Sequence, residues 1–272
     1  MAVKLIALDL DGTILRGHKE VTKRTREAMW AALESGIFVV PATGRSYTDI
    51  PDAVRGIPGL SFFLTSNGAN ILDGRGLNSI YTDLIPWKQA VQALHIIEEY
   101  GTQPSVHMNG SSINLKTADP RIIARYGNTD YFTRGSVENL ADYVAEQKTD
   151  VEKIFAVLFE PQRKTELTAR ITSEFPMAVS ASGPDNVELN SQTASKGRGL
   201  SVLCGKLGIR AEETAVVGDS INDISMFEFA GCSVVMGNGE NCLKAMARYE
   251  TDTCWEDGAA KAIEKIVSGT WS

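Results

Sequence analysis

Short apolar runs alternate with a helix-like segment in the first part of the chain. The runs at 3–8, 37–40 and 61–65 each have the length and composition of a buried strand. Residues 20–35 are helical in composition and stop before Gly36, a residue type that favours the position just after a helix. This order of elements predicts a parallel sheet whose strands are joined by right-handed crossovers.

The same pattern of strand and helix resumes towards the C-terminal end. Residues 214–217 and 232–236 are predicted strands, and 195–207 and 257–268 are predicted helices. Asp257 stands at the start of the last helix and is expected to be its N-cap. The predicted sheet is therefore built from both ends of the chain.

The middle of the chain has a different texture. It begins with a helix over 86–100 and continues with short strand-like runs, such as 153–159, among turns rich in Gly, Asn and Pro. We predict an α/β fold with two domains. A Rossmann-like parallel sheet core is expected over 1–84 and 186–272, with an inserted α+β cap domain over 85–185.

Composition restricts the possible partners. The net charge is −7 and there is no block of Lys or Arg, so a nucleic-acid partner is not expected. No apolar run approaches the roughly 20 residues that a membrane-spanning helix needs. The first ten residues show no signal pattern, and none of the four cysteines forms a C-x-x-C pair, so reduced thiols and a cytoplasmic location are expected. The oligomeric state stays open.

Four polar clusters fall just after predicted strands. They are residues 9–13 (DLDGT), residues 43–45 (TGR), Lys196 and residues 218–223 (GDSIND). In an open parallel sheet the C-terminal ends of the strands share one edge, and ligands bind there. Segments far apart in the sequence are therefore expected to meet at one site.

The residue types in these clusters suit phosphoryl transfer. Asp9, Asp11 and Asp219 offer hard oxygen donors of the kind that Mg²⁺ prefers. One carboxylate is able to attack phosphorus, and a second, two residues away on the same face of an extended strand, is able to protonate the leaving oxygen. Thr43 and Lys196 add a hydroxyl and a cation for the phosphoryl oxygens.

On these motifs the sequence resembles the haloacid dehalogenase (HAD) superfamily, and within it the Cof-type, C2-capped phosphatases of class IIB. Residues 9–13 match the first motif, D-x-D-G-T; Thr43 matches the second and Lys196 the third; residues 218–223 match the fourth, G-D-x-x-N-D. The resemblance covers both flanking segments, and over the insertion it rests on position and size. It implies a phosphoric monoester hydrolase that uses Mg²⁺.

The resemblance also implies a role for each motif residue. Asp9 is expected to be the nucleophile and a metal ligand. Asp11 is expected to be the general acid and base, with its backbone carbonyl on the metal, and Asp219 to be the third protein ligand. The groups expected to hold the phosphoryl group are the backbone of Leu10 together with Thr43, Gly44, Lys196 and Asn222. Asp223 is expected to orient the metal waters or Lys196.

Several residues near the motifs keep open roles. Arg45 is expected either to bind substrate or to pair with a core carboxylate, and Asn67 to be a turn residue that borders the site. In the cap, His107 and Asn109 have either a structural role, which we favour, or a contact with substrate. Pro41 has no N–H group, so the second strand is expected to stop pairing there or to bulge.

The function expected from the sequence is Mg²⁺-dependent hydrolysis of a small phosphorylated metabolite through an aspartyl-phosphate. Sugar phosphates are the expected class, with pyridoxal phosphate, flavin mononucleotide and nucleotides behind them. A sugar phosphomutase is an alternative, because it shares the first half-reaction. A phosphate-binding or receiver-like signalling module is less compatible, because such modules lack a D-x-D-G-T after the first strand and lack a large insertion.

Overall fold

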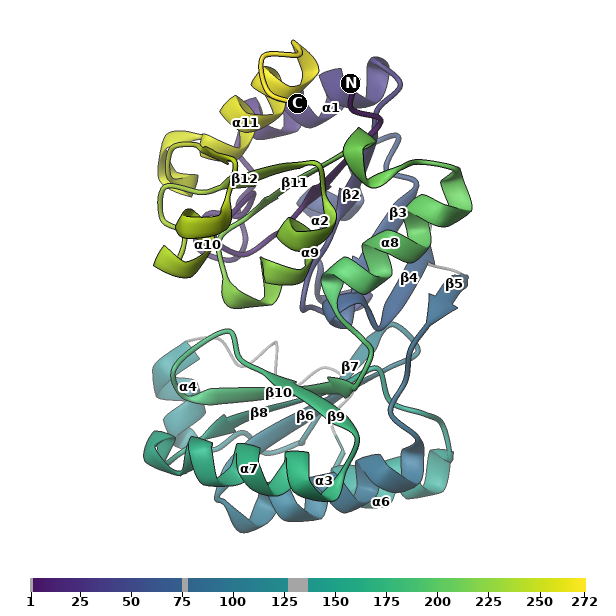
Figure 1. Cartoon of the computed structure of the whole chain (residues 1–272). Helices are drawn as coiled ribbons and strands as arrows, with labels where there is room; N and C mark the ends of the chain where they lie inside the picture. Colours follow the sequence, from purple (N-terminus) through teal and green to yellow (C-terminus); the bar gives the residue numbers. More distant parts are fainter. Residues whose placement is uncertain (1, 75–77, 127–136) are drawn as a thin grey trace. The chain divides into compact units, whose positions relative to one another are not determined.

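The structure is a computed structural model of the chain and describes residues 2–74, 78–126 and 137–272. By their contacts the residues fall into two compact units (Figure 1). Unit 1 contains residues 1–45, 50–81 and 195–272, and unit 2 contains residues 46–49 and 82–194. Among the described residues, no helix is long and apolar enough to cross a membrane.

The chain enters unit 2 after Tyr81 and leaves it after Ala194, whereas a cap over 85–185 was expected from the sequence. The later exit has a simple cause. Strand β10 (Asn186–Ser191) pairs antiparallel with two other strands of unit 2 and is therefore part of its sheet. The sequence also did not indicate that the short segment Ser46–Asp49 belongs to unit 2.

Unit 1 contains the expected parallel sheet, with strand order β13-β12-β11-β1-β2. Its strands are β1 (Leu5–Leu8), β2 (Phe38–Pro41), β11 (Thr214–Gly218), β12 (Cys232–Val235) and β13 (Tyr249–Glu250). The run 61–65, predicted as the third parallel strand, is instead β3 (Phe62–Thr65) of a smaller sheet with β4 (Asn70–Asp73) and β5 (Ser79–Thr82), where it pairs antiparallel with β4. A parallel bridge between Ala42 and Leu64 joins the two sheets just beyond the end of β2.

Helices cover both faces of the parallel sheet (Figure 1). They are α1 (Lys23–Glu34), α2 (Asp52–Arg55), α8 (Lys196–Leu207), α9 (Ile224–Phe229), α10 (Asn241–Met246) and α11 (Gly258–Val267). Strand β1 is fully buried, as expected of a central parallel strand. Leu5 and Ala7 pack in one cluster with Leu200 of α8 and Met226 of α9. The alternate residues of β1 face the other side, where α1 and α11 pack together.

Pro41 neither ends the pairing of β2 nor forces a bulge, so that expectation is corrected. Leu8 pairs with Pro41 in regular parallel register, and the N–H of Ala42 donates to Leu8 O at 2.8 Å. Because alternate residues of a strand point their N–H groups to opposite sides, the nitrogen of Pro41 points away from β1. It lies on the outer edge of the five-stranded sheet, where a proline is tolerated.

Asp257 stands at the N-cap position of α11, but its side chain does not cap the helix, so the capping expectation is also corrected. Its Oδ1 instead accepts hydrogen bonds from Thr22 Oγ1 and from the Arg16 guanidinium, each at 2.7 Å. Thr22 is the N-cap of α1. The carboxylate of Asp257 therefore ties the start of the last helix to the start of the first.

Unit 2 is an antiparallel sheet with three helices on one face and a short helix on the other. The strand order is β7-β6-β8-β10-β9, with β6 (Thr102–Met108), β7 (Ser111–Asn114), β8 (Lys153–Leu158) and β9 (Met177–Ser180) beside β10. Its helices are α3 (Trp87–Glu99), α4 (Pro120–Tyr126), α6 (Leu140–Gln147) and α7 (Lys164–Glu174). Apolar residues of α3, α6 and α7 form one core with Val106, Ile154 and Val187 of the sheet.

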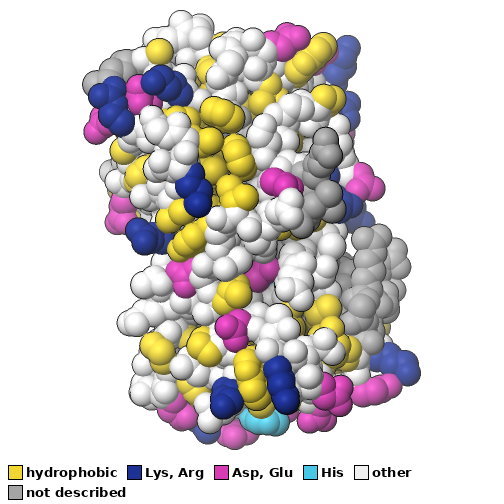
Figure 2. Space-filling view, turned by 90° about the vertical axis from the view of Figure 1, so that its right-hand side faces the viewer, with side chains coloured by type: hydrophobic (Ala, Val, Ile, Leu, Met, Phe, Trp, Pro, Cys, Tyr) yellow, Lys and Arg dark blue, Asp and Glu magenta, His cyan; other side chains and the backbone are white. Residues whose placement is uncertain are grey.

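Hydrophobic side chains gather on the face of unit 1 that carries β3, β4 and β5 (Figure 2). Phe62, Ile80 and Tyr81 on these strands are half-buried and pack against the core. Phe38 of β2 contacts Phe62, with ring centroids 6.1 Å apart. The smaller sheet therefore completes the core of unit 1 beyond the edge strand β2.

Close packing at the start of α8 gives a stability prediction. A Cβ at Gly197 would lie 2.0 Å from the backbone oxygen of Ser225, whereas a Cβ at Gly205 of the same helix would meet nothing within 4 Å. We expect Gly197→Ala to lower the free energy of unfolding by about 1–3 kcal/mol. Gly205→Ala, the matched control, should raise it by up to about 1 kcal/mol. Urea unfolding measures both, and equal effects of the two substitutions would contradict this packing.

Candidate active site

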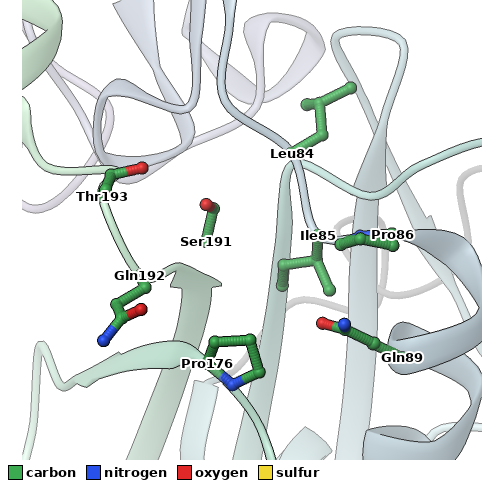
Figure 3. Close-up of a pocket in the computed structure, with 8 residues that line it drawn as sticks. All are labelled: Leu84, Ile85, Pro86, Gln89, Pro176, Ser191, Gln192 and Thr193. Atoms are coloured by element: carbon green, nitrogen blue, oxygen red, sulfur yellow. The ribbon is translucent and has the colours of Figure 1, made fainter.

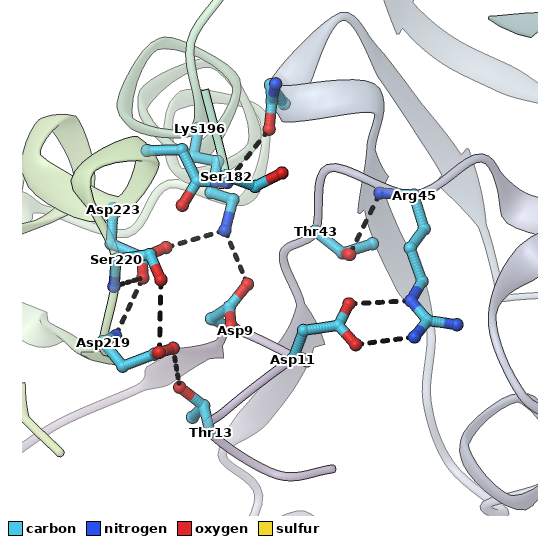
Figure 4. A network of polar contacts seen from close by, with 12 residues as sticks. Asp9, Asp11, Thr13, Thr43, Arg45, Ser182, Lys196, Asp219, Ser220 and Asp223 are labelled. Carbon is cyan, nitrogen blue, oxygen red and sulfur yellow. Dashed lines mark hydrogen bonds and ion pairs between the residues drawn. The ribbon is translucent and has the colours of Figure 1, made fainter. Parts of the chain in front are cut away.

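Three neighbouring strands deliver the predicted chemical groups to one edge of the sheet. Asp9 follows β1, Thr43 comes two residues after β2, and Asp219 follows β11. The strands are adjacent in the order β11-β1-β2 and all parallel, so their C-terminal ends lie together. The backbone N–H of Asp9 donates to Val217 O at 3.0 Å, which extends the pairing to the start of the site. Figure 4 shows the side chains converging at this edge.

Lys196 stands at the centre of the group. It is the first residue of α8, after the N-cap Ser195, and its side chain is fully buried. Its Nζ donates to Asp9 Oδ1 at 2.6 Å and to Asp223 Oδ1 at 2.7 Å (Figure 4). Burial by itself would lower the pKa of this amine, but the charges of Asp223 and Asp9 raise it above its usual range. The side chain is therefore a buried cation shared by two carboxylates.

Asp223 holds the loop that carries Asp219. Its Oδ2 accepts hydrogen bonds from the backbone N–H groups of Asp219 at 2.9 Å and Ser220 at 3.1 Å. A Cβ at position 218 would lie 2.5 Å from the same oxygen, which explains why Gly218 precedes the pair. Because Asp223 also binds Lys196, it sets the position of both the loop and the cation.

The carboxylate of Asp219 is fixed by two hydroxyl groups. Thr13 Oγ1 donates to its Oδ1 at 3.0 Å, and Ser220 Oγ donates to its Oδ2 at 3.1 Å. Gly12 has a φ of +81°, and a Cβ there would lie 2.5 Å from Asp219 Oδ2. A residue with a side chain would be both strained and in collision at this turn. The chain after β1 is therefore shaped to fit closely around Asp219.

The buried carboxylates form a donor set that suits a hard cation. Oxygen atoms of Asp9, Asp219 and Asp223 all lie within 4.8 Å of one another. Burial, with the nearby negative charges of Asp223 and Asp219, raises the pKa of Asp9 well above its ordinary value, although Lys196 opposes this. Burial and the charge of Asp223 raise the pKa of Asp219 to about 6. The cluster has three carboxylates around the single cation of Lys196, and a divalent cation would relieve both this charge imbalance and the cost of burying the carboxylates.

Asp11 lies beside this group but is held by different partners. Arg45 donates from Nε to Asp11 Oδ2 at 2.7 Å and from a terminal nitrogen to Oδ1 at 2.6 Å (Figure 4). The Nδ1 of His18 lies 2.7 Å from the same Oδ1. Burial by itself would raise the pKa of Asp11, but the hydrogen bonds from Arg45 and His18 lower it below its usual range. Of the two roles expected for Arg45, the structure shows the pairing with a carboxylate.

The residues expected to hold a phosphoryl group surround the same place. Thr43 is buried and accepts a hydrogen bond from the backbone N–H of Arg45 at 3.1 Å. The N–H of Asn67 donates to Thr43 O at 3.0 Å, and the Asn67 side-chain oxygen accepts from Asn222 Nδ2 at 3.3 Å. Asn67 has a φ of 58°, the left-handed conformation of a turn residue. Leu10 is buried, and its carbonyl accepts hydrogen bonds from the backbone N–H groups of Thr13 at 3.2 Å and Leu15 at 2.8 Å. Gly44 directly follows Thr43.

Sequence reasoning gave no role to three residues that contact the carboxylates. Thr13 and Ser220 lie inside the motifs DLDGT and GDSIND, so their polar side chains were a readable signal. His18 carried no such signal. It reaches Asp11 because Gly17 and His18 both have positive φ, of 53° and 63°, which turns the chain back.

Unit 2 places its two candidate residues differently. His107 is buried in β6, and burial together with the charge of Lys153 lowers its pKa well below the usual value. Asn109 is exposed at the tight turn between β6 and β7, with a φ of 52°, followed by Gly110 at 74°. Two successive positive φ values are the geometry of a type I′ hairpin turn, so Asn109 has a structural role there.

A separate hollow of about 300 Å³ lies within unit 2 (Figure 3). Its lining residues are Leu84, Ile85, Pro86, Gln89, Pro176, Ser191, Gln192 and Thr193. None of them carries a charge, so this hollow lacks the cation that a phosphoryl group needs. The carboxylate cluster remains the candidate site.

Comparison with known proteins agrees with this geometry. The family model of the haloacid dehalogenase-like hydrolases matches residues 6–263. The chain belongs to the haloacid dehalogenase-like hydrolases. As a member whose relatives are named phosphatases, it is a phosphoric monoester hydrolase, as the motifs predicted.

Two curated relatives and one solved structure illustrate the similarity. The phosphatase YwpJ of Bacillus subtilis is 30% identical over 97% of this chain and 100% of its own length. The 5-amino-6-(5-phospho-D-ribitylamino)uracil phosphatase YcsE of the same organism is 28% identical over 97% of this chain and 96% of its own. A haloacid dehalogenase-like hydrolase from B. subtilis has a TM-score of 0.80 at 29% identity, covering 96% of this chain and 99% of that one. The Cof-type interpretation and the α/β fold with a parallel sheet are thereby confirmed.

The raised pKa of Asp219 predicts how the metal-free hydrolase responds to pH. A carboxyl group whose pKa rises from 3.8 to about 6 on folding binds more protons in the native than in the unfolded state between these values. Its contribution to stability is therefore lost as the pH increases through this window. With a chelator present, Asp219→Asn should unfold with a free energy about 1–3 kcal/mol higher than wild type at about pH 7, and the gain should shrink towards about pH 4.5. Urea unfolding across this range is the test, and a variant less stable than wild type at neutral pH would contradict the interpretation.

Proposed function

We propose that this hydrolase is a Mg²⁺-dependent phosphatase of small phosphorylated metabolites that works through an aspartyl-phosphate on Asp9. The observation that carries the proposal is the contact of 2.6 Å between the buried Lys196 and Asp9, beside the carboxylate of Asp219. Lys196 is thus already adjacent to Asp9. Lys196 is the cation that would neutralise an incoming phosphoryl group, and Asp9 is the carboxylate that would attack it. Positioning and charge neutralisation are most of what phosphoryl transfer requires.

In the first half-reaction a carboxylate oxygen of Asp9 attacks phosphorus. A new bond forms between Asp9 and phosphorus, and the bond from phosphorus to the ester oxygen breaks. Asp11 gives its proton to that oxygen, so the product leaves as an alcohol. Lys196 and the neighbouring Thr43 and Asn222 hold the phosphoryl oxygens during the transfer.

In the second half-reaction a water molecule attacks the phosphorus of the acyl phosphate. Asp11, now a carboxylate, takes a proton from this water, and the bond between phosphorus and Asp9 breaks. Inorganic phosphate leaves and Asp9 is restored as a carboxylate. The two hydrogen bonds from Arg45 lower the pKa of Asp11 and so favour the carboxylate form that the second step uses.

Asp9 and Asp219 are the side chains proposed to hold Mg²⁺, together with the backbone carbonyl of Asp11. The donor set fits, because it offers hard oxygens with an excess of negative charge. When bound, Mg²⁺ supplies positive charge that stabilises the developing charge on the phosphoryl oxygens. Asp223 has both oxygens engaged, with Lys196 on one and two backbone N–H groups on the other, so we assign it to orienting the site.

Unit 2 is proposed to be the cap that selects the substrate. The sheet face opposite α3, α6 and α7 is largely polar, because most of the residues that alternate with the core positions are hydrophilic. Phe155 and Val157, which pack with Ile122 of α4, are apolar residues on this face. Buried examples on this face are Ser105, His107, Ser112, Asn114, Lys153, Asn186 and Glu188. Lys153 Nζ lies 3.3 Å from Glu188 Oε2, and Ser182 Oγ donates to Glu188 Oε1 at 2.7 Å.

This polar face favours a sugar phosphate or a similar polyol phosphate. Ser105 Oγ is buried and has no hydrogen-bond partner among the residues that the structure describes. A buried hydroxyl without a partner costs about 1–3 kcal/mol unless a ligand supplies one. Substrate hydroxyl groups would do so. The named substrate of YcsE carries a phosphorylated ribityl chain, which belongs to the same chemical class.

Metal removal tests the proposed function. Hydrolysis of 4-nitrophenyl phosphate should disappear in excess chelator and return with Mg²⁺, because the charge that Mg²⁺ supplies would be missing. Mg²⁺ should also raise the melting temperature of the wild type and not that of Asp219→Asn, which provides a readout independent of turnover. Full activity in excess chelator, or equal stabilisation of both proteins, would rule out the metal assignment.

Substitution of Ser105 tests the proposed role of the cap. Ser105→Ala should leave stability unchanged or raise it by up to about 1 kcal/mol, because it removes a buried hydroxyl without a partner. It should lower kcat/KM for the best sugar phosphate in a panel by about 5–10-fold and leave 4-nitrophenyl phosphate within about two-fold. Lys196→Ala is the control and should depress all substrates together. An unchanged ranking of substrates in Ser105→Ala would contradict the polyol assignment.

A further inference from the structure

Arg45 binds Asp11 and is the last residue of unit 1 before the chain passes into unit 2 at Ser46. Its backbone is fixed in unit 1 at both ends. Its N–H donates to Thr43 Oγ1 at 3.1 Å, and its carbonyl accepts from the N–H of Ser66 at 2.8 Å. Its guanidinium makes the two bonds to Asp11 described above and a third, of 2.9 Å, to His18 O. Both the backbone and the guanidinium of Arg45 are therefore held by residues of unit 1.

The next four residues, Ser46–Asp49, belong to unit 2 by their contacts, and the chain returns to unit 1 at Ile50. The N–H of Thr48 donates to Gly110 O at 3.1 Å. Ser46 is fully buried, and its Oγ donates to Asp49 Oδ2 at 2.7 Å. The segment is thus a compact turn with its own hydrogen bond and a defined contact in unit 2.

The contact point of the segment is itself rigidly held in unit 2. Gly110 lies in the type I′ turn between β6 and β7, and its N–H donates to Glu152 Oε1 at 2.7 Å. Glu152 is buried, and the backbone N–H of Glu152 donates to His107 O at 2.8 Å. This turn therefore follows directly from the strand whose polar face we assign to the substrate.

We propose that Arg45 is a positioning residue for Asp11, and that Ser46–Asp49 makes this positioning depend on unit 2 through the Thr48–Gly110 hydrogen bond. The inference rests on the proposed function, because it assigns to Asp11 the role of general acid and base. A displacement at the Gly110 turn reaches Asp11 through three chain residues and one guanidinium. Proton transfer by Asp11 is thereby coupled to the unit that selects the substrate.

The bidentate geometry is what makes Arg45 suitable for this role. Two parallel N–H···O bonds fix the plane of a carboxylate as well as its position, which a single cation does not do. A misplacement of about 1 Å in a catalytic group is enough to cost about 10²-fold in rate. A small shift of the segment is therefore sufficient to change how well Asp11 transfers a proton.

Leaving-group dependence separates this role from a merely structural one. 4-Nitrophenyl phosphate has a leaving group that needs little protonation, whereas phenyl phosphate has a poorer one. In Arg45→Ala the kcat/KM for phenyl phosphate should fall at least about 10-fold more than that for 4-nitrophenyl phosphate. A burst of nitrophenolate should also appear, because hydrolysis of the aspartyl-phosphate, which needs Asp11 as base, becomes slow. Arg45→Lys, which retains the charge without the bidentate geometry, should fall between wild type and Arg45→Ala.

The contribution of the segment is tested at Thr48 with a matched pair of variants. Thr48→Pro removes the N–H that binds Gly110, whereas Thr48→Ala keeps it. Thr48→Pro should show the leaving-group discrimination and the burst seen in Arg45→Ala, and Thr48→Ala should match wild type. Ser46→Ala loses the hydroxyl that bonds to Asp49 at 2.7 Å and contacts Thr48 Oγ1 at 3.2 Å. It should show a weaker form of the same discrimination and provides a second measurement that does not introduce proline.

The outcomes distinguish the two levels of the account. If wild type fails to hydrolyse both esters in the presence of Mg²⁺, the proposed function is wrong. If wild type is active but Arg45→Ala loses both esters equally and shows no burst, the positioning role alone is overturned. If Arg45→Ala behaves as expected while Thr48→Pro and Ser46→Ala both match Thr48→Ala, the coupling through the segment is overturned.

Discussion

The shared contact of Lys196 with Asp9 and Asp223 is the interaction on which the rest of the site depends. All three side chains are buried, and a buried carboxylate without a cation would be strongly destabilising. Lys196 begins α8, whose next residue packs directly on the backbone of Ser225, so the cation has little freedom to move. Asp223 in turn holds the loop that carries Asp219. The same bonds thus keep the fold together at this edge and assemble the chemical groups.

Much of unit 1 was predictable because its strands are short, apolar and buried on both faces. Parallel strands end at one edge, so Asp9, Thr43 and Asp219 were expected to lie close together, and the structure places them there. These predictions succeeded because they follow from strand geometry and need no knowledge of side-chain pairing.

The remaining features depend on contacts between residues that are far apart in the sequence. The sequence left two roles open for Arg45, substrate binding or pairing with a carboxylate, and did not indicate that Asp11 is its partner. Asp257 has the residue type and position of an N-cap, but a tertiary contact with Arg16 takes its carboxylate instead. The effect of Pro41 depended on which side of its strand is the edge of the sheet. In each of these three cases the residue type suggested a local role, and a contact with a residue distant in the sequence determined the actual one.

The proposed division of the task between the two units is only outlined by the sequence. The carboxylates and Lys196 lie in unit 1, whereas unit 2 has the buried hydroxyl, imidazole and charged groups that we propose distinguish substrates. Strand alternation predicts which residues share this face once the register is known. The register was not available from the sequence, because the strands of unit 2 are short and separated by irregular turns.

The central claim is that Asp9 carries the phosphoryl group, and one measurement tests it most directly. Asp11→Asn protein is mixed with 4-nitrophenyl phosphate and Mg²⁺, quenched in acid within the first turnovers, digested and analysed by peptide mass spectrometry. Loss of the base should slow hydrolysis of the intermediate, so the account predicts a phosphorylated peptide with the modification at Asp9. Modification at any other residue, or nitrophenolate release with no phosphorylated peptide, would contradict it.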